Sequence, residues 1–160
     1  SMVILGIDPG LATIGYGVIE RGPGKKPSLK YISCGLIETT PADARPERLK
    51  KINNELSRLI KKHRPNVLAM ENIYFFRNQK TIIQVSQAGG VILLTAAKNN
   101  LPVFGFTPLE VKMTVTGFGR AEKTEVQKKI KKLLKLKELP KADDAADALA
   151  VALTYIIKET

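Results

Sequence analysis

The chain has 160 residues, of which 44% are hydrophobic and 26% are charged. This length suits one domain with a hydrophobic core and leaves little room for two full domains, so we expect a single domain over residues 2–160. The sequence contains no apolar run of about eighteen residues or more, which argues against a transmembrane helix. No segment combines a basic face with a large aromatic face, which argues against an anionic membrane as a partner. Ser1 before Met2 is interpreted as a remnant of cloning.

The charge balance points to a polyanionic partner. Lysine and arginine number 26 against 15 aspartate and glutamate residues, which gives a net charge of +11. Such an excess favours nucleic acid, although a lysine-rich surface of a heat-adapted protein is the alternative. Cys34 is the single cysteine, so no internal disulfide forms and we expect a cytoplasmic protein. His63 is the single histidine, which excludes a multi-histidine metal site.

The first part of the chain predicts three strands. An apolar run over residues 3–7 ends at Asp8-Pro9-Gly10, and further strands are expected over 13–20 and 30–39. A short loop rich in glycine and proline joins the second strand to the third. Strands joined in this way form an antiparallel meander.

After residue 46 the hydrophobic period becomes helical. We expect helices over 46–62, 81–99, 123–136 and 142–158, a short helix opened by Thr107-Pro108, and buried strands over 67–70 and 101–106. Right-handed crossovers place the later strands parallel to the first one. The predicted fold class is therefore α/β, with a mixed sheet flanked by helices.

Two carboxylates follow apolar strands. Asp8 ends the first strand and Glu71 ends the strand over 67–70. If these strands are parallel neighbours, both carboxylates emerge at the carboxyl edge of the sheet, where ligands of open α/β sheets bind. A helix or loop cap is the alternative role for either residue alone.

Further acids open the last helix. Asp144 and Asp147 are three residues apart and share one helical face. Acidic residues also suit the first turn of a helix, and Asp143 could serve as its N-cap. Asp147, however, stands among alanine, leucine and valine residues, where an unpaired charge is costly. A divalent cation removes that cost.

These acids predict a metal site with oxygen ligands. Asp8, Glu71, Asp144 and Asp147 suit Mg²⁺, with Mn²⁺ as a substitute, whereas zinc prefers nitrogen and sulfur. Two ions about 4 Å apart can activate water and stabilise the leaving oxygen in phosphodiester hydrolysis. We therefore expect up to two ions per chain.

Basic and aromatic residues surround the acids in the sequence. Lys112, Arg120, Lys123 and the lysines of helix 123–136 could neutralise phosphates, or could simply form a solvated face. Tyr74 lies in an aromatic and basic cluster after Glu71. Its ring could stack on an unpaired base or pack in the core.

Three ordered motifs resemble the RuvC family of Holliday-junction resolvases, which are crossover junction endodeoxyribonucleases. LGIDPG over 5–10, with GYGV over 15–18, resembles its amino-terminal signature; AME over 69–71 and DAADALA over 144–150 match its other two acidic motifs. The resemblance extends from Met2 to about Ile157.

The resemblance implies an RNase H-like fold with a five-stranded mixed sheet. It also implies a Mg²⁺-dependent homodimer that cuts two strands of a four-way DNA junction symmetrically in recombination and repair. A branch-migration helicase complex is a further partner to expect.

The resemblance also assigns roles to residues. Asp8, Glu71, Asp144 and Asp147 match the catalytic positions. Lys112 and Lys123 match lysines implicated in junction binding and cleavage, and Tyr74 matches an aromatic residue that stacks near the junction centre.

Three other functions compete with this one. Actin-like ATPases begin with a similar motif but need a second domain, for which the chain is too short. A RuvC-like nuclease that processes structured RNA is the nearer alternative. A non-catalytic nucleic-acid binder is disfavoured, because converging acids repel phosphate unless metal is present.

Symmetric cutting predicts a dimer, because one chain has one carboxylate cluster. We expect the helix over 81–99 to form the interface, with Ile82 or Ile83, Ser86 and Gly90 near the two-fold axis.

Overall fold

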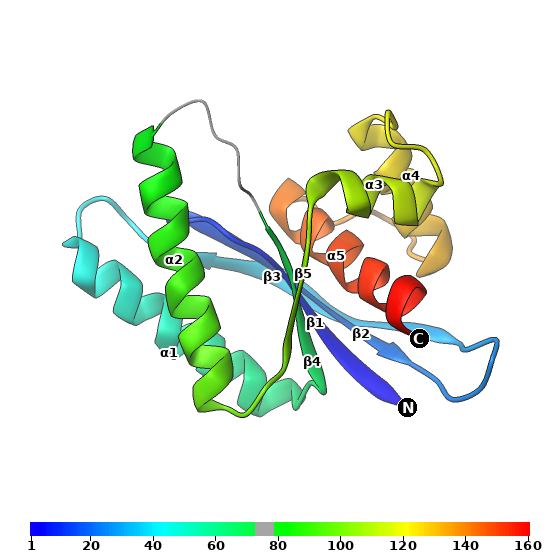
Figure 1. The fold of residues 1–160 in the computed structure, drawn as a ribbon, viewed down its shortest axis with the longest axis horizontal. Coiled ribbons are helices and arrows are strands. Elements are labelled where there is room, and N and C mark those ends of the chain that lie inside the picture. The colour runs from blue at the N-terminus through cyan, green and yellow to red at the C-terminus, as the bar shows by residue number, and fades with distance from the viewer. Residues whose placement is uncertain (73–78) are drawn as a thin grey trace.

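The computed structural model describes residues 1–72 and 79–160, which form one five-stranded sheet with helices on both faces (Figure 1). The strands are β1 (Met2–Asp8), β2 (Thr13–Arg21), β3 (Leu29–Glu38), β4 (Val67–Glu71) and β5 (Val103–Phe106). The helices are α1 (Arg45–His63), α2 (Gln79–Lys98), α3 (Pro108–Thr116), α4 (Lys123–Leu133) and α5 (Asp143–Glu159). Over the described ranges, no helix is both long and apolar enough to cross a membrane.

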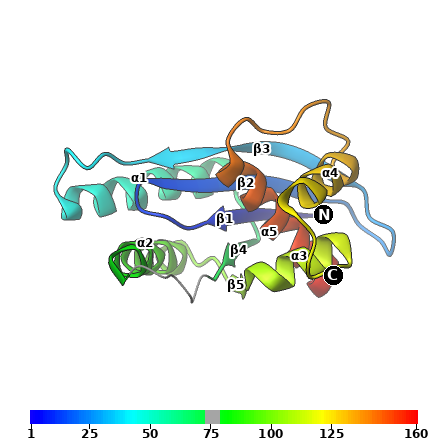
Figure 2. The same cartoon turned by 90° about the horizontal axis from the view of Figure 1, so that it is seen from above.

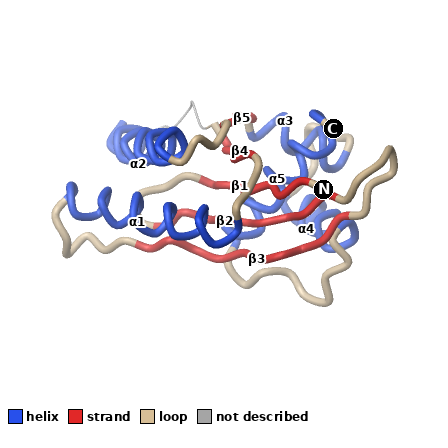
Figure 3. The backbone as a smooth tube through the Cα atoms, turned by 90° about the horizontal axis from the view of Figure 1, so that it is seen from below, coloured by secondary structure: helices blue, strands red, loops and turns tan. Residues whose placement is uncertain are grey.

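The sheet is mixed, with strand order β3-β2-β1-β4-β5 (Figure 3). β1 pairs antiparallel with β2, and β2 with β3, which confirms the predicted meander. β4 runs parallel to both β1 and β5, as right-handed crossovers require. Because β1 and β4 are parallel neighbours, their carboxyl ends lie at one edge of the sheet.

Alternating side chains divide the core between the two faces of the sheet. On β1, Ile4 belongs to the core under α3, α4 and α5, whereas Leu5 and Ile7 belong to the core under α1 and α2. Successive strand residues point to opposite faces, so this division follows directly from the apolar run of β1. Figure 2 shows α3, α4 and α5 gathered together, away from α1 and α2.

The ends of the helices largely follow the sequence signals. Thr107 accepts a hydrogen bond from the backbone N–H of Glu110, whose carboxylate accepts one from the Thr107 N–H, so a capping box opens α3. α4 is shorter than predicted. It ends at Leu133 instead of residue 136, because Lys135 takes a left-handed conformation with φ of 53°.

Candidate active site

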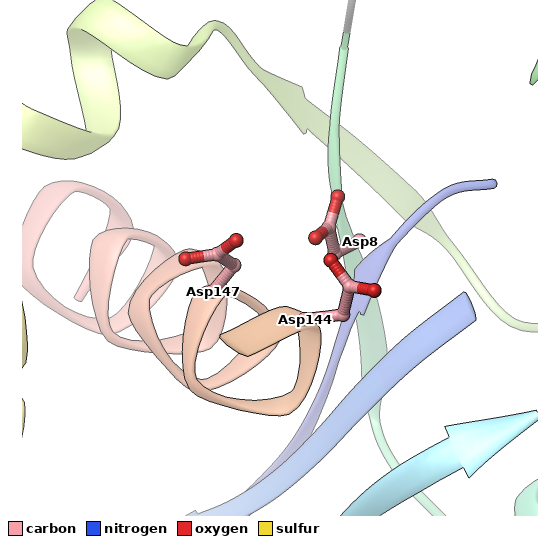
Figure 4. A group of neighbouring side chains, drawn as sticks. All are labelled: Asp8, Asp144 and Asp147. Atoms are coloured by element: carbon pink, nitrogen blue, oxygen red, sulfur yellow. The ribbon is translucent and has the colours of Figure 1, made fainter. Parts of the chain in front are cut away.

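Three carboxylates converge at the sheet edge where β1 ends. One carboxylate oxygen from each of Asp8, Asp144 and Asp147 lies within 4.8 Å of the others. Asp8 comes from the last position of β1, and the other two come from the first two turns of α5. Figure 4 shows the three side chains turned toward a common space between the strand and the helix. A set of oxygen donors alone suits a hard divalent cation.

Glu71 joins this cluster through Asp8. It ends β4 beside β1, and its carboxylate accepts a hydrogen bond from the protonated carboxyl group of Asp8. The group whose oxygens approach within 4.8 Å contains the three aspartates and not Glu71. The four acids predicted from the sequence therefore do lie together, with Glu71 at the margin of the tightest group.

Burial makes the charged forms of these acids unfavourable. It raises the pKa of Asp8 from 3.8 to about 9, and the nearby carboxylates of Glu71, Asp147 and Asp144 add to the rise. Burial also raises the pKa of Glu71 and the pKa of Asp147. Several carboxylates crowded together away from water form a cluster that a divalent cation would stabilise strongly.

Two lysines lie beside the cluster. Lys112 on α3 and Lys123 at the start of α4 line a cavity of about 510 Å³, together with Glu71 and Asp147. The positive charge of Lys112 opposes the rise in the pKa of Glu71, and that of Lys123 opposes the rise for Asp147. Apolar residues such as Val111 form other parts of the wall. Acidic side chains of the cluster and two lysine side chains therefore line the same cavity.

Asp143 does not cap α5. The N-cap is Ala142, which makes no side-chain capping bond, so the N-cap interpretation of Asp143 is wrong. The Asp143 carboxylate instead accepts a hydrogen bond of 3.0 Å from the Lys123 ammonium and a longer one from the Gln127 amide. This partner was missed because nothing in the sequence links residues 20 positions apart on different helices.

Comparison with known proteins identifies the family. The sequence profile described as "Crossover junction endodeoxyribonuclease RuvC" matches residues 4–155. The chain belongs to the RuvC family. It is 46% identical to the RuvC of Caldicellulosiruptor saccharolyticus over 99% of this chain and 95% of the relative. It is 49% identical to the RuvC of Petrotoga mobilis over 96% of this chain and 93% of the relative.

Solved RuvC structures share the fold. RuvC of Thermus thermophilus superposes with a TM-score of 0.92 at 32% identity, over 99% of this chain and 95% of that one. The same protein "in complex with Holliday junction substrate" superposes with a TM-score of 0.94 at 31% identity, with the same coverage. These matches confirm the expected RNase H-like fold.

The comparisons also bear on the chemistry. The relatives named above are endodeoxyribonucleases, and the alternative of a nuclease for structured RNA has no support among them. Membership of the RuvC family and the acidic cluster together indicate that this chain uses a divalent metal. Among the other predicted residues, Arg120 is exposed between α3 and α4, and Tyr74 lies outside the described residues.

The raised pKa of Asp8 predicts a stability cost for this RuvC protein without metal. Between 3.8 and about 9, folded Asp8 keeps a proton that the unfolded chain has released. The free energy of unfolding therefore falls as pH rises through that window. Asp8→Asn removes this loss, and we expect it to stabilise the metal-free protein by on the order of 2 kcal/mol at about pH 8. Thermal unfolding in excess EDTA measures the effect.

The same measurement at about pH 4 is the control. At that pH, close to the ordinary pKa of 3.8, roughly two fifths of the unfolded Asp8 carboxyls still carry their proton, so the advantage of the asparagine variant should shrink strongly. An advantage that is equal at the two pH values would mean that it does not arise from the ionisation of Asp8.

Proposed function

We propose that this chain resolves four-way DNA junctions by metal-dependent phosphodiester hydrolysis at the cluster of Asp8, Glu71, Asp144 and Asp147. The observation that carries the proposal is the approach of three carboxylate oxygens within 4.8 Å at the carboxyl edge of the sheet, in a member of the RuvC family. Its structural relative from Thermus thermophilus has been solved with a Holliday junction substrate, which supports the same substrate for this chain.

The donor set fits Mg²⁺, with Mn²⁺ as a substitute, and up to two ions. Asp8, Asp144 and Asp147 offer oxygens close enough to share an ion, and Glu71 beside Asp8 extends the set. When bound, such ions activate water and stabilise charge on the phosphate and the leaving oxygen. The protein contributes the fixed carboxylates, each of which must lose any proton it holds before it can bind an ion.

The cations beside the acids would hold the DNA. Lys112 and Lys123 on the wall of the cavity place positive charge next to the cluster, where the phosphate that is cut must lie. Arg120, exposed between α3 and α4, extends this positive surface. We assign Tyr74 a stacking role on an unpaired base through the family resemblance alone.

Assembly and location complete the proposal. We propose that residues 2–160 act as one nuclease domain, that two chains form a homodimer through α2, and that a branch-migration helicase complex delivers the junction. With its single cysteine and its DNA substrate, the protein is assigned to the cytoplasm.

Cleavage of a synthetic four-way junction tests the function. We expect paired cuts in the presence of Mg²⁺ or Mn²⁺ and no cuts in EDTA, because the bound ions would activate the attacking water and stabilise the leaving oxygen. A linear DNA duplex of the same sequence and a four-way RNA junction are the controls, and both should be cut far more slowly. Equal cutting of the linear duplex, or cutting that survives EDTA, would contradict the proposal.

A further inference from the structure

Helix α5 lies unusually close to the backbone of β1 and β2. Glycines occupy the strand positions beneath it, and a Cβ atom added at Gly15 would overlap the carbonyl oxygen of Asp144. It would also lie only 3.0 Å from the backbone nitrogen of Ala145. The first turn of α5 therefore rests directly on the strand, where an ordinary side chain would hold it away.

Gly15 also lies directly beside the strand that carries the first carboxylate. In the register of β1 and β2, Gly15 is the partner of Asp8. The same residue thus contacts the backbone of Asp144 on the helix and pairs with Asp8 on the neighbouring strand. Gly15 is therefore one of the places where α5 meets the sheet backbone closely, and Gly6 beneath Ala148 is another.

We propose that Gly15 is a positioning residue of the metal site, because its missing side chain sets the depth at which α5 brings Asp144 and Asp147 to Asp8. This inference rests on the proposed role of the cluster in metal binding. The Asp144 oxygen would be more than 1 Å inside the ordinary contact distance of 3.4 Å to a Cβ atom. Ligand distances in a metal site tolerate shifts of only about 0.2 Å. The shift of α5 that would remove this overlap is therefore larger than the change in ligand distance that the metal site tolerates.

Gly17 provides a matched comparison on the same strand and under the same helix. A Cβ atom there would meet the side chain of Leu149, at 2.7 Å from Cδ2, and the backbone nitrogen of Leu149 at 3.0 Å. The overlap falls on the Leu149 side chain, whose Cγ would also lie at 2.8 Å, and the Leu149 backbone needs to move by only a few tenths of an ångström. Gly17→Ala therefore introduces the same methyl group but displaces the carboxylates much less.

The experiment compares Gly15→Ala with Gly17→Ala by calorimetric titration with Mn²⁺ in the absence of DNA. We expect Gly15→Ala to bind Mn²⁺ at least tenfold more weakly, in the range of about 10–100-fold seen for residues that orient metal ligands. Gly17→Ala should stay within about threefold of the unmodified chain on the same scale. Junction binding in EDTA should be unchanged in both variants, because the phosphate-binding lysines are untouched.

A longer acidic side chain at position 144 distinguishes a positioning role of Gly15 from a general loss of stability in Gly15→Ala. Glutamate extends one methylene farther than aspartate, so Asp144→Glu should recover part of the Mn²⁺ affinity in the Gly15→Ala background. In the unmodified background, where the spacing is already correct, Asp144→Glu should weaken Mn²⁺ binding. A merely destabilised protein would not show this reversal of sign.

The outcomes are distinguishable. If the unmodified chain binds no Mn²⁺, the proposed metal site fails. If it binds and Gly15→Ala binds equally well, the metal site stands and the positioning role of Gly15 is overturned. If Gly15→Ala does not fold, Asp144→Glu alone decides: unchanged Mn²⁺ affinity would mean that the spacing is not critical and would overturn the inference.

Discussion

Asp147→Asn is expected to lower the rate of junction cleavage by about 10³-fold while leaving junction binding intact. Asp147 offers one of the three oxygens that lie within 4.8 Å of each other, and an amide removes its negative charge without changing its size. Loss of a metal ligand removes several kcal/mol of transition-state stabilisation, and about 4 kcal/mol corresponds to 10³-fold. Single-turnover cleavage in saturating Mg²⁺, with binding measured separately in EDTA, tests this expectation.

Asp143→Asn is the matched control, because it makes the same chemical change on the same helix. Asp143 lies outside the three-carboxylate group and pairs with Lys123 in an exposed salt bridge, which contributes little to stability. Its cleavage rate should stay within about tenfold of the unmodified chain, since only a lysine contact is altered. Asp8→Asn should behave like Asp147→Asn. Mg²⁺-dependent cutting at the normal rate by either of these two would remove that residue from the metal site.

Much of the fold could be predicted because the hydrophobic pattern changes period at the right places. The alternation over β2 and β3, followed by the helical spacing of Ile52, Leu56 and Ile60 in α1, specifies a meander and then a crossover. The parallel placement of β4 beside β1 then follows from the handedness of crossovers, without any contact information. The shared edge of Asp8 and Glu71 was predictable for this reason.

The less predictable features depend on contacts between distant residues. The early end of α4 comes from the left-handed conformation of Lys135, at a position where no glycine signals a stop. The close approach of α5 depends on Gly15 meeting Asp144, about 130 positions later in the chain. The sequence alone does not indicate why position 15 needs a glycine. The reason, the carbonyl oxygen of Asp144, lies next to it only in the folded structure.

The surface of α2 supports the proposed homodimer interface. Ile83 and Leu94 are 55% and 60% exposed on this helix, and Gly90 lies between them along the same face. A side chain added at Gly90 would meet no atom within 4 Å in the single chain. Exposed apolar side chains around an open glycine are what close helix packing between two copies requires.

Gly90→Glu is therefore expected to separate the dimer without unfolding the chain. Two copies would bring two unpaired carboxylates together at a desolvated axis, which costs several kcal/mol and weakens dimerisation by about 10²-fold or more. Sedimentation velocity at micromolar concentration measures the change. Gly90→Ala is the control, because it gives the same gain in helix propensity with little bulk and no charge, and it should remain dimeric.

Loss of the dimer should also change the products of cleavage. A supercoiled plasmid with an extruded four-way junction becomes linear when both cuts occur within one complex, and becomes a nicked circle when the cuts are independent. The unmodified chain should yield linear plasmid, and Gly90→Glu should yield nicked circles at a reduced rate, because each separated chain carries one carboxylate cluster within its described residues. A monomeric unmodified chain, or a Gly90→Glu variant that remains dimeric and yields linear plasmid, would exclude α2 as the interface.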